Sequence, residues 1–267
     1  MKKLSVLAIL FAFVACATVP VTGRKQMNLL PESQLVGMAL TSYNQFLSEN
    51  PALPISNAQT AQIKEVGDRI SRAATKYLRS KGAGDRVSGF KWDFNLVKSN
   101  EVNAWCMPGG KVVFYTGLLP IAKNIDGIAV IMGHEVAHAI ARHGNECMSQ
   151  GLMVQAGGMA LDVALSQKSA QTRSLFAQAY GLGATVGAVL PFSRLHESEA
   201  DKLGLVFAAI AGYNIDEAAP FWQRMSKVGG GSRPPEFLST HPDPNSRDKD
   251  IQEYLPTAKA IGRKYKL

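Results

Sequence analysis

The sequence predicts a mainly helical α+β fold in one domain, with a small β-sheet beside a central buried helix. Two observations predict the helices: apolar residues recur with a helical period over several long segments, and one segment near the middle of the chain is apolar on most sides. A third predicts the sheet, because short β-rich stretches alternate with turn residues over 90–116. The chain has 267 residues, 46% of them hydrophobic, which suits one domain behind a short leader.

The elements before the central helix follow from periodicity and from the residues that interrupt it. Apolar side chains such as Ile63, Val66 and Ile70 share one side of the second helix, and glycines at 82 and 84 end that pattern. The expected elements are helices over 31–48 and 57–79 and strands over 90–97, 101–105 and 111–116, with a turn at 108–110.

Residues Asn103, Ala104 and Trp105 are the candidate substrate strand. An edge strand can bind an extended peptide, which adds to the sheet as a further strand. Asn103 is a poor strand former, which favours a role beyond packing. The alternative is that these three residues only pack the sheet.

The central helix carries the sequence His-Glu-Val-Ala-His at 134–138, an HExxH motif. Residues i and i+4 share a helix face, so the rings of His134 and His138 can converge on one zinc ion. Glu135, beside them, suits a general base that takes a proton from a metal-activated water. Two histidines and a glutamate can also meet by chance, but on a largely buried helix three ionisable groups without a partner would be costly.

A catalytic zinc site needs a third protein ligand, and a second helix beginning near residue 195 offers one. Glu197 and Asp201 share a face of that helix, whereas Glu199 is expected to point toward solvent. Glu197 is therefore the predicted third ligand, and Asp201 the predicted hydrogen-bond acceptor for the outer nitrogen of a ligand histidine. The alternative is an ordinary solvated acidic face at a helix start.

Four motifs together resemble those of the M48 metallopeptidases. The resemblance implies a minimal zincin of the glutamate type, one Zn²⁺ per chain held by His134, His138 and Glu197, and endopeptidase activity. The motifs are Val-Thr-Gly-Arg-Lys-Gln at 21–26, Asn-Ala at 103–104 followed by Pro-Gly-Gly at 108–110, HExxH at 134–138, and Ser-Arg at 193–194 leading to ExxAD at 197–201.

The same resemblance gives a role to a histidine near the C-terminus. In some envelope members of the family, a histidine in a matching His-Pro segment approaches the metal, which implies that His241 fills the open ligand position or steadies the reacting oxyanion. Arg247 would clamp a carboxylate or orient His241. The alternative is a proline-rich surface loop with an incidental histidine. His143 and His196 are expected to be surface or packing residues.

The N-terminus resembles a bacterial lipoprotein signal. Two lysines precede an apolar block that ends just before Cys16, and the block is too short to span a membrane. The expected organisation is a signal peptide at 1–15, a tether at 16–30 that begins with a lipidated Cys16, and a metallopeptidase domain at 31–267. Ordinary signal-peptidase cleavage nearby is the alternative. These features place the protein in the bacterial envelope, lipid-anchored and facing the periplasm, with the outer membrane favoured.

Residues 148–192 are expected to form a helical hairpin that turns near 166–169. Its second half has no charged residue over 174–193, which favours a buried or membrane-touching helix over the active site; a membrane span is the alternative. In an exported protein, Cys106 and Cys147 can form a disulfide if the family layout brings both beside the active site, or remain two small buried residues.

The net charge and its distribution limit the kinds of partner that this protein is expected to bind. The net charge is +8, but the basic residues are scattered, so nucleic acid is not expected and an anionic membrane surface is the more natural neighbour. The expected function is a zinc endopeptidase that cleaves misfolded or unassembled envelope polypeptides. The alternative is an envelope chaperone or assembly factor with latent proteolysis. A prenyl-protein protease is disfavoured, because several long membrane spans are lacking.

Overall fold

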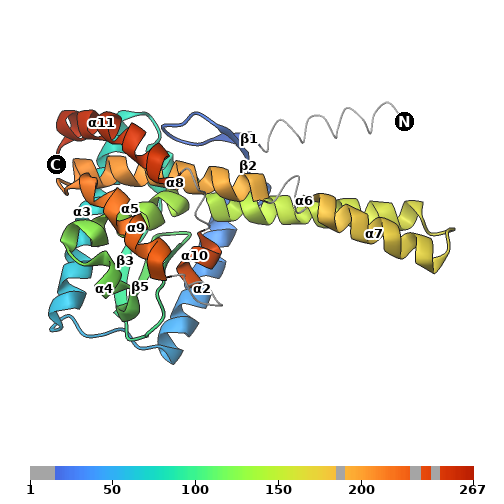
Figure 1. The fold of residues 1–267 in the computed structure, drawn as a ribbon, viewed down its shortest axis with the longest axis horizontal. Helices are drawn as coiled ribbons and strands as arrows, with labels where there is room; N and C mark the ends of the chain where they lie inside the picture. The colour runs from blue at the N-terminus through green and yellow to red at the C-terminus, as the bar shows by residue number, and fades with distance from the viewer. Residues whose placement is uncertain (1–15, 185–189, 229–235, 242–246) are drawn as a thin grey trace.

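The structure is a computed structural model that describes residues 16–184, 190–228, 236–241 and 247–267. Within these ranges the chain is mostly helical, as the sequence predicts, with the expected small sheet of three strands and a second sheet of two strands (Figure 1). The leader at 1–15 and part of the uncharged stretch at 174–193 lie outside the described residues. Lipidation of Cys16 stays a prediction.

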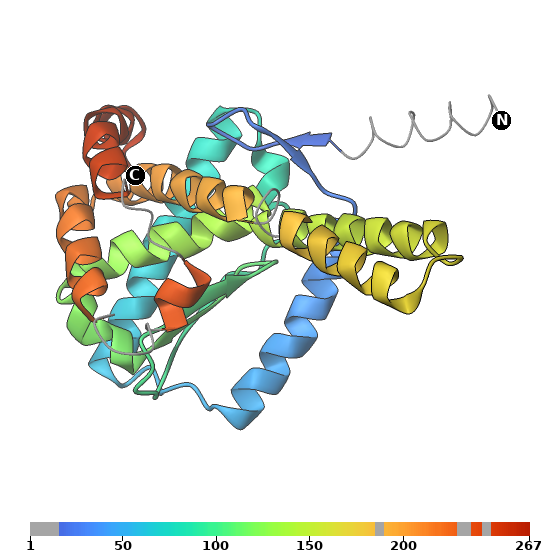
Figure 2. The same ribbon diagram turned by 45° about the vertical axis from the view of Figure 1, so that its right-hand side comes forward.

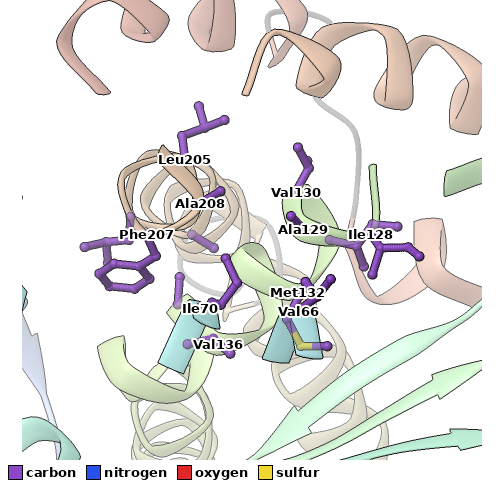
Figure 3. Packing of buried hydrophobic residues seen from close by; sticks show 14 of the residues in the cluster. Val66, Ile70, Ile128, Ala129, Val130, Met132, Val136, Leu205, Phe207 and Ala208 are labelled. Carbon is purple, nitrogen blue, oxygen red and sulfur yellow. The ribbon is translucent and has the colours of Figure 1, made fainter. Parts of the chain in front are cut away.

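Two helices form the centre of the fold. Helix α5 (Ile125–Ala141) carries the HExxH motif and packs most extensively against α8 (Leu190–Ile210), which carries Glu197. Helix α3 (Ala58–Ser80) packs against both, and α11 (Arg247–Tyr265) lies along α8 (Figures 1 and 2). Figure 3 shows buried apolar side chains of α3, α5 and α8 that meet in one core: Val66 and Ile70 from α3, Met132 and Val136 from α5, and Leu205, Phe207 and Ala208 from α8.

The crossing of α5 and α8 depends on two glycines that face each other. A Cβ atom added at Gly204 would lie 2.7 Å from the carbonyl carbon of Gly133 and 2.7 Å from the amide nitrogen of His134. A Cβ added at Gly133 would lie 2.6 Å from the Gly204 carbonyl oxygen. Such distances are far shorter than ordinary van der Waals contacts, so only glycine allows the two backbones to come this close.

A three-stranded sheet packs beside α5 and has the order β3-β5-β4. Strand β5 (Lys111–Tyr115) is central, parallel to β3 (Asp93–Val97) and antiparallel to β4 (Ala104–Met107). The candidate substrate strand thus lies at an edge, as predicted. The turn before β5 contains Gly109 and Gly110, both with φ near +85°, where a side chain would be strained.

The helices before the sheet match the predicted segments closely. Helix α2 comprises Glu32–Glu49, and α3 begins after Asn57, whose side chain accepts hydrogen bonds from the amides of Gln59 and Thr60. Helix α5 ends at Ala141, and the capping residue Arg142 has φ +60°. The remaining short elements are β1 (Cys16–Thr18), β2 (Lys25–Met27), η1 (Gly84–Val87), η2 (Thr116–Leu118), α4 (Leu119–Ala122), η4 (Ile215–Glu217), α9 (Ala218–Val228) and α10 (Glu236–Thr240).

Residues 16–30 do not form the expected tether. Strands β1 and β2 pair as an antiparallel hairpin, and the hairpin is packed onto the domain. Val19 is fully buried in the main core, and Gln26 donates a hydrogen bond to the carbonyl of Ala141 at the end of α5 (2.8 Å). The prediction failed because long-range contacts to Glu146 and Glu199 cannot be read from local composition.

The predicted helical hairpin is present as α6 (His143–Ala164) and α7 (Ala170–Ala184), joined at the expected turn. It projects away from the body instead of folding over the active site (Figures 1 and 2). The described part of α7 is largely exposed, so the expected burial is wrong, while contact with a membrane stays a prediction. Among the described residues, no helix is both long and apolar enough to cross a membrane.

Candidate metal centre

The two histidines of α5 and the glutamate of α8 meet in the core of the molecule. His134 and His138 lie one turn apart, and their Nε2 atoms are 3.0 Å from each other. Each Nε2 lies 3.3 Å from an oxygen of Glu197. One ligand atom from each of these residues and from His241 lies within 4.8 Å of the others. The structure therefore brings together the three ligands that the sequence predicts.

The donor set fits a zinc ion. The Nδ1 atom of His134 lies 2.9 Å from Oδ1 of Asp201, and a carboxylate accepts only, so Nδ1 carries a proton and Nε2 is the nitrogen left to bind a metal. Nε2 faces the second imidazole and Glu197. Two imidazole nitrogens and a carboxylate around one point are the ligands of a catalytic zinc site.

The pKa values reflect burial together with strong local pairing. Burial alone would lower the pKa of His134, but hydrogen bonds to Asp201 and Glu197 raise it to about 9. Burial would raise the pKa of Glu197, yet the surrounding histidines hold it well below its usual range. Burial lowers the pKa of His138 well below its ordinary value. Glu197 is therefore a carboxylate, the form that can bind a metal.

Glu135 lies next to the ligand cluster but makes no hydrogen bond through one of its oxygens. Its side chain is buried, and among the described residues Oε1 has no hydrogen-bond partner; this oxygen lies 3.5 Å from Nε2 of His241. Burial raises the pKa of this carboxyl. A buried carboxylate with a free oxygen and increased basicity is suited to accept a proton from water.

His241 follows the short helix α10 and lies inside the cluster, not in a surface loop. Its Nδ1 is 3.2 Å from both oxygens of Glu197 and 3.3 Å from Nε2 of His134. Its backbone amide donates to the carbonyl of Phe237, which holds the ring in place. His241 thus stands where a fourth ligand would stand; its role in the reaction stays a prediction.

Arg247, the first residue of α11, binds the carboxylates of Asp201 and of the predicted ligand Glu197. Its Nη2 donates to Asp201 (2.8 Å) and its Nη1 donates to Glu197 (3.3 Å). Its guanidinium carbon lies 3.4 Å from the ring centroid of Trp222, which is buried beside His134. Arg247 therefore clamps carboxylates, one of the two predicted roles. Sequence patterns alone do not single out Trp222, because an aromatic residue on an amphipathic helix usually only packs in the core.

A second buried polar cluster contradicts the expectation for Glu199. This glutamate is 3% exposed and accepts hydrogen bonds from Thr22 Oγ1 (2.6 Å) and Arg24 Nε (2.8 Å) of the β1–β2 hairpin. His143 and His196 are also buried, with their rings stacked 4.3 Å apart, so they are not surface residues. Helical periodicity placed Glu199 on the solvent side because the sequence does not show the hairpin that covers it.

The two remaining cysteines do not form the disulfide that the sequence allowed. Both Cys106 and Cys147 are free thiols. Cys106 lies on β4, whereas Cys147 lies on α6 with its Sγ 3.7 Å from Nδ1 of His196. The structure thus matches the unpaired alternative, although Cys147 is exposed and not buried.

The candidate substrate strand lies next to the metal centre, since β4 packs against α5. The carbonyl of Asn103 accepts a hydrogen bond from the amide of Tyr115 on β5. The side chain of Asn103 is buried, but its Oδ1 has no hydrogen-bond partner among the described residues. Trp105 is partly exposed, with its Nε1 3.3 Å from the hydroxyl of Tyr115.

A helical α+β fold with a buried HExxH helix, a glutamate ligand from a second helix and a neighbouring edge strand defines a metallopeptidase. The sequence profile of peptidase family M48 matches residues 57–255, which is more than half of the chain. The chain therefore belongs to peptidase family M48 and is a metallopeptidase.

Relatives of known name agree with this family. The mitochondrial metalloendopeptidase OMA1 of Schizosaccharomyces pombe is 31% identical over 93% of this chain and 69% of its own length. Human mitochondrial OMA1 is 27% identical over 98% of this chain and 50% of its own length. The β-barrel assembly-enhancing protease of Escherichia coli is 28% identical over 67% of this chain and 38% of its own length. The chain thus spans between about a third and two thirds of these proteins.

These relatives overturn the expected location in the bacterial envelope. The OMA1 proteins of fission yeast, budding yeast and human are mitochondrial by name. The prediction depended on the short leader and on Cys16. The placement as an outer-membrane lipoprotein is withdrawn.

Proposed function

We propose that the protein is a zinc-dependent endopeptidase that cleaves extended segments of misfolded or unassembled polypeptides. The observation that carries the proposal is Glu135, a buried carboxylate with a free oxygen beside three converging metal ligands. A zinc ion held by His134, His138 and Glu197 would supply Lewis acidity to a water molecule and to a peptide carbonyl.

The protein's own residues account for the proton transfers and for substrate placement. Glu135 takes the proton of the attacking water and then passes it to the amine that leaves when the peptide bond breaks. The edge of β4 can hold the substrate as an added antiparallel or parallel strand, because main-chain hydrogen bonds do not depend on substrate sequence. Such binding requires an extended chain, which favours unfolded substrates over folded ones.

Removal of the metal tests the proposed function directly. We expect the purified chain to contain one zinc ion and to cleave unfolded casein. We expect a chelator to abolish cleavage, and added zinc to restore it. The measurements are metal content by atomic spectroscopy and the appearance of new N-termini from casein. Absence of zinc, together with cleavage that resists chelation, would contradict the proposed site.

His241 gives a second prediction, on latency. Because its Nδ1 lies within 3.3 Å of Glu197 and His134, it occupies space that water and substrate need. We expect His241→Ala to raise kcat/KM for casein by up to about tenfold, the gain if roughly 90% of the wild-type chains are closed at rest. Zinc content should be unchanged. A fall in activity would instead assign His241 to stabilisation of the transition state.

The exposed hairpin favours a second candidate function, the binding of unfolded chains without cleavage. Helices α6 and α7 present apolar side chains to solvent, and such surfaces mark interaction sites. Met and Phe side chains adapt to varied apolar partners. The exposed residues are Met148, Leu152, Met153, Met159, Val163, Leu175 and Phe176.

This second function is tested in Glu135→Gln, so that cleavage does not interfere. We expect this variant to suppress aggregation of a heat-denatured protein, measured by light scattering. Adding Met153→Ser and Phe176→Ser should remove most of the suppression. The matched control adds Ile55→Ser, which alters an apolar side chain of similar exposure outside the hairpin. Equal suppression by all three forms would exclude the hairpin as the binding surface.

A further inference from the structure

The ring of each ligand histidine is hydrogen-bonded on the side away from the metal position, but the two rings have different partners. Both present Nε2 to the metal position, so Nδ1 is the outer nitrogen of each ring. The outer nitrogen of His134 contacts Asp201, which is held by Arg247. Among the residues that the structure describes, no carboxylate is hydrogen-bonded to the outer nitrogen of His138. Instead it lies 2.9 Å from Nδ1 of His143.

Hydrogen-bond chemistry fixes the direction of this second chain. If Nε2 of His138 carries the metal-binding lone pair, its proton is on Nδ1 and is donated to Nδ1 of His143. The ring of His143 then has its own proton on Nε2, which lies 3.3 Å from Oε2 of Glu199. The carboxylate of Glu199 accepts a hydrogen bond from this Nε2–H group, and this selects the tautomer of both rings.

Arg24 holds Glu199 in this position. Its Nε donates to Glu199 (2.8 Å), while Nη1 and Nη2 form a two-bond pair with Glu146 (2.7 Å each). The Arg24 side chain is only 15% exposed. It therefore neutralises two buried carboxylates that would otherwise repel each other, and the planar guanidinium fixes their orientation.

Arg24 does not belong to the helices that carry the ligands. It lies in the β1–β2 hairpin, outside the residues 57–255 that match the family profile. The hairpin is fixed by Arg86, which donates to the carbonyl of Thr18 (2.6 Å) and to Gln26 (2.9 Å). Arg24 also accounts for the motif at 21–26, to which the peptidase chemistry assigns no role.

We propose that Arg24 is a positioning residue of the metal centre, acting through Glu199 and His143 on His138. The N-terminal hairpin is thereby a working part of the metal site. When the hairpin is docked, the ring of His138 is held in the tautomer and orientation that bind zinc. When Arg24 is lost, Glu199 has no cation beside it, and His143 loses its fixed acceptor. The proposal rests on the zinc site of the proposed function.

The test compares zinc binding by wild type, Arg24→Ala and Arg24→Lys. We expect Arg24→Ala to weaken zinc affinity measurably and by at most about 10–100-fold, the usual cost of losing a direct outer partner of a ligand histidine. Lysine keeps the charge but loses the two-bond pair, so Arg24→Lys should recover only part of the affinity. The measurement is competition with a chromogenic chelator, and it does not require peptidase activity.

Lys25→Ala is the matched control, because Lys25 is the exposed next residue, the first of β2, and its loss removes the same charge. It should bind zinc like wild type. Thermal unfolding without zinc separates positioning from folding. A lower melting temperature in Arg24→Ala with unchanged zinc affinity would mean a purely structural role and would overturn the proposal. If Arg24→Ala does not fold, Thr22→Val serves instead, since it removes only one hydrogen bond to Glu199.

A double variant tests whether the residues act in series. If Arg24 acts through His143, then Arg24→Ala combined with His143→Ala should weaken zinc binding no more than His143→Ala alone. Additive losses would overturn the chain of contacts. If the wild type binds no zinc, the proposed metal centre is wrong. If the wild type and the Arg24 variants bind zinc with equal affinity, only the role of Arg24 is wrong.

Discussion

Replacing Glu135 by glutamine is expected to lower kcat/KM for casein by about 10²–10⁴-fold, the usual contribution of a general base. Glutamine has nearly the same shape, so the core around α5 should not change. Its amide cannot accept a proton from water, however. Because Glu135 is not among the four clustered metal-binding side chains, zinc should stay at one ion per chain. The measurements are steady-state cleavage and metal content on the same samples.

The control for this substitution is Glu253→Gln, which makes the same chemical change on the exposed face of α11. It should leave cleavage and zinc content unaltered. If Glu135→Gln cleaves casein at the wild-type rate, another group is the base and the free oxygen of Glu135 has no part in the reaction. If it loses zinc as well, the carboxylate supports the metal centre instead of the proton transfer.

The sequence predicts most of the metal centre because that information is local. His134 and His138 share a helix face, and so do Glu197 and Asp201, so each pair is defined within two helical turns. Amphipathic periodicity likewise located α3, since apolar residues repeat on one side of this 23-residue helix from Ile63 to Leu78. The sequence suggested that the strand at residues 103–105 lies at the edge of the sheet, and the observed order β3-β5-β4 confirms this position.

What the sequence could not show depends on contacts between distant segments. Glu199 pointed to solvent by helical geometry, but Arg24 reaches it across 175 residues of chain. Trp222 lies under Arg247 only because α9 and α11 pack together. The hairpin of α6 and α7 was located correctly but placed over the site, because apolar composition indicates burial without saying where.

The close crossing of α5 and α8 was also invisible in the sequence, and it supports the second large prediction. We expect Gly204→Ala to lower the free energy of unfolding by about 1–3 kcal/mol or more, the usual cost of overpacking a core. Here the added methyl group would meet backbone atoms of Gly133 and His134, which cannot move independently as a side chain can. The helices must separate, and the separation would move His134 away from Glu197. Zinc affinity should therefore fall together with stability.

Urea unfolding without zinc, and chelator competition for zinc, measure the two effects separately. The control is Gly151→Ala on α6, where an added Cβ meets no atom within 4 Å. That change should raise stability by up to about 1 kcal/mol, because alanine favours a helix more than glycine does. Wild-type stability in Gly204→Ala would mean that the two helices do not cross at the glycine pair. Lost stability with unchanged zinc affinity would mean that the ligands keep their positions although the crossing has loosened.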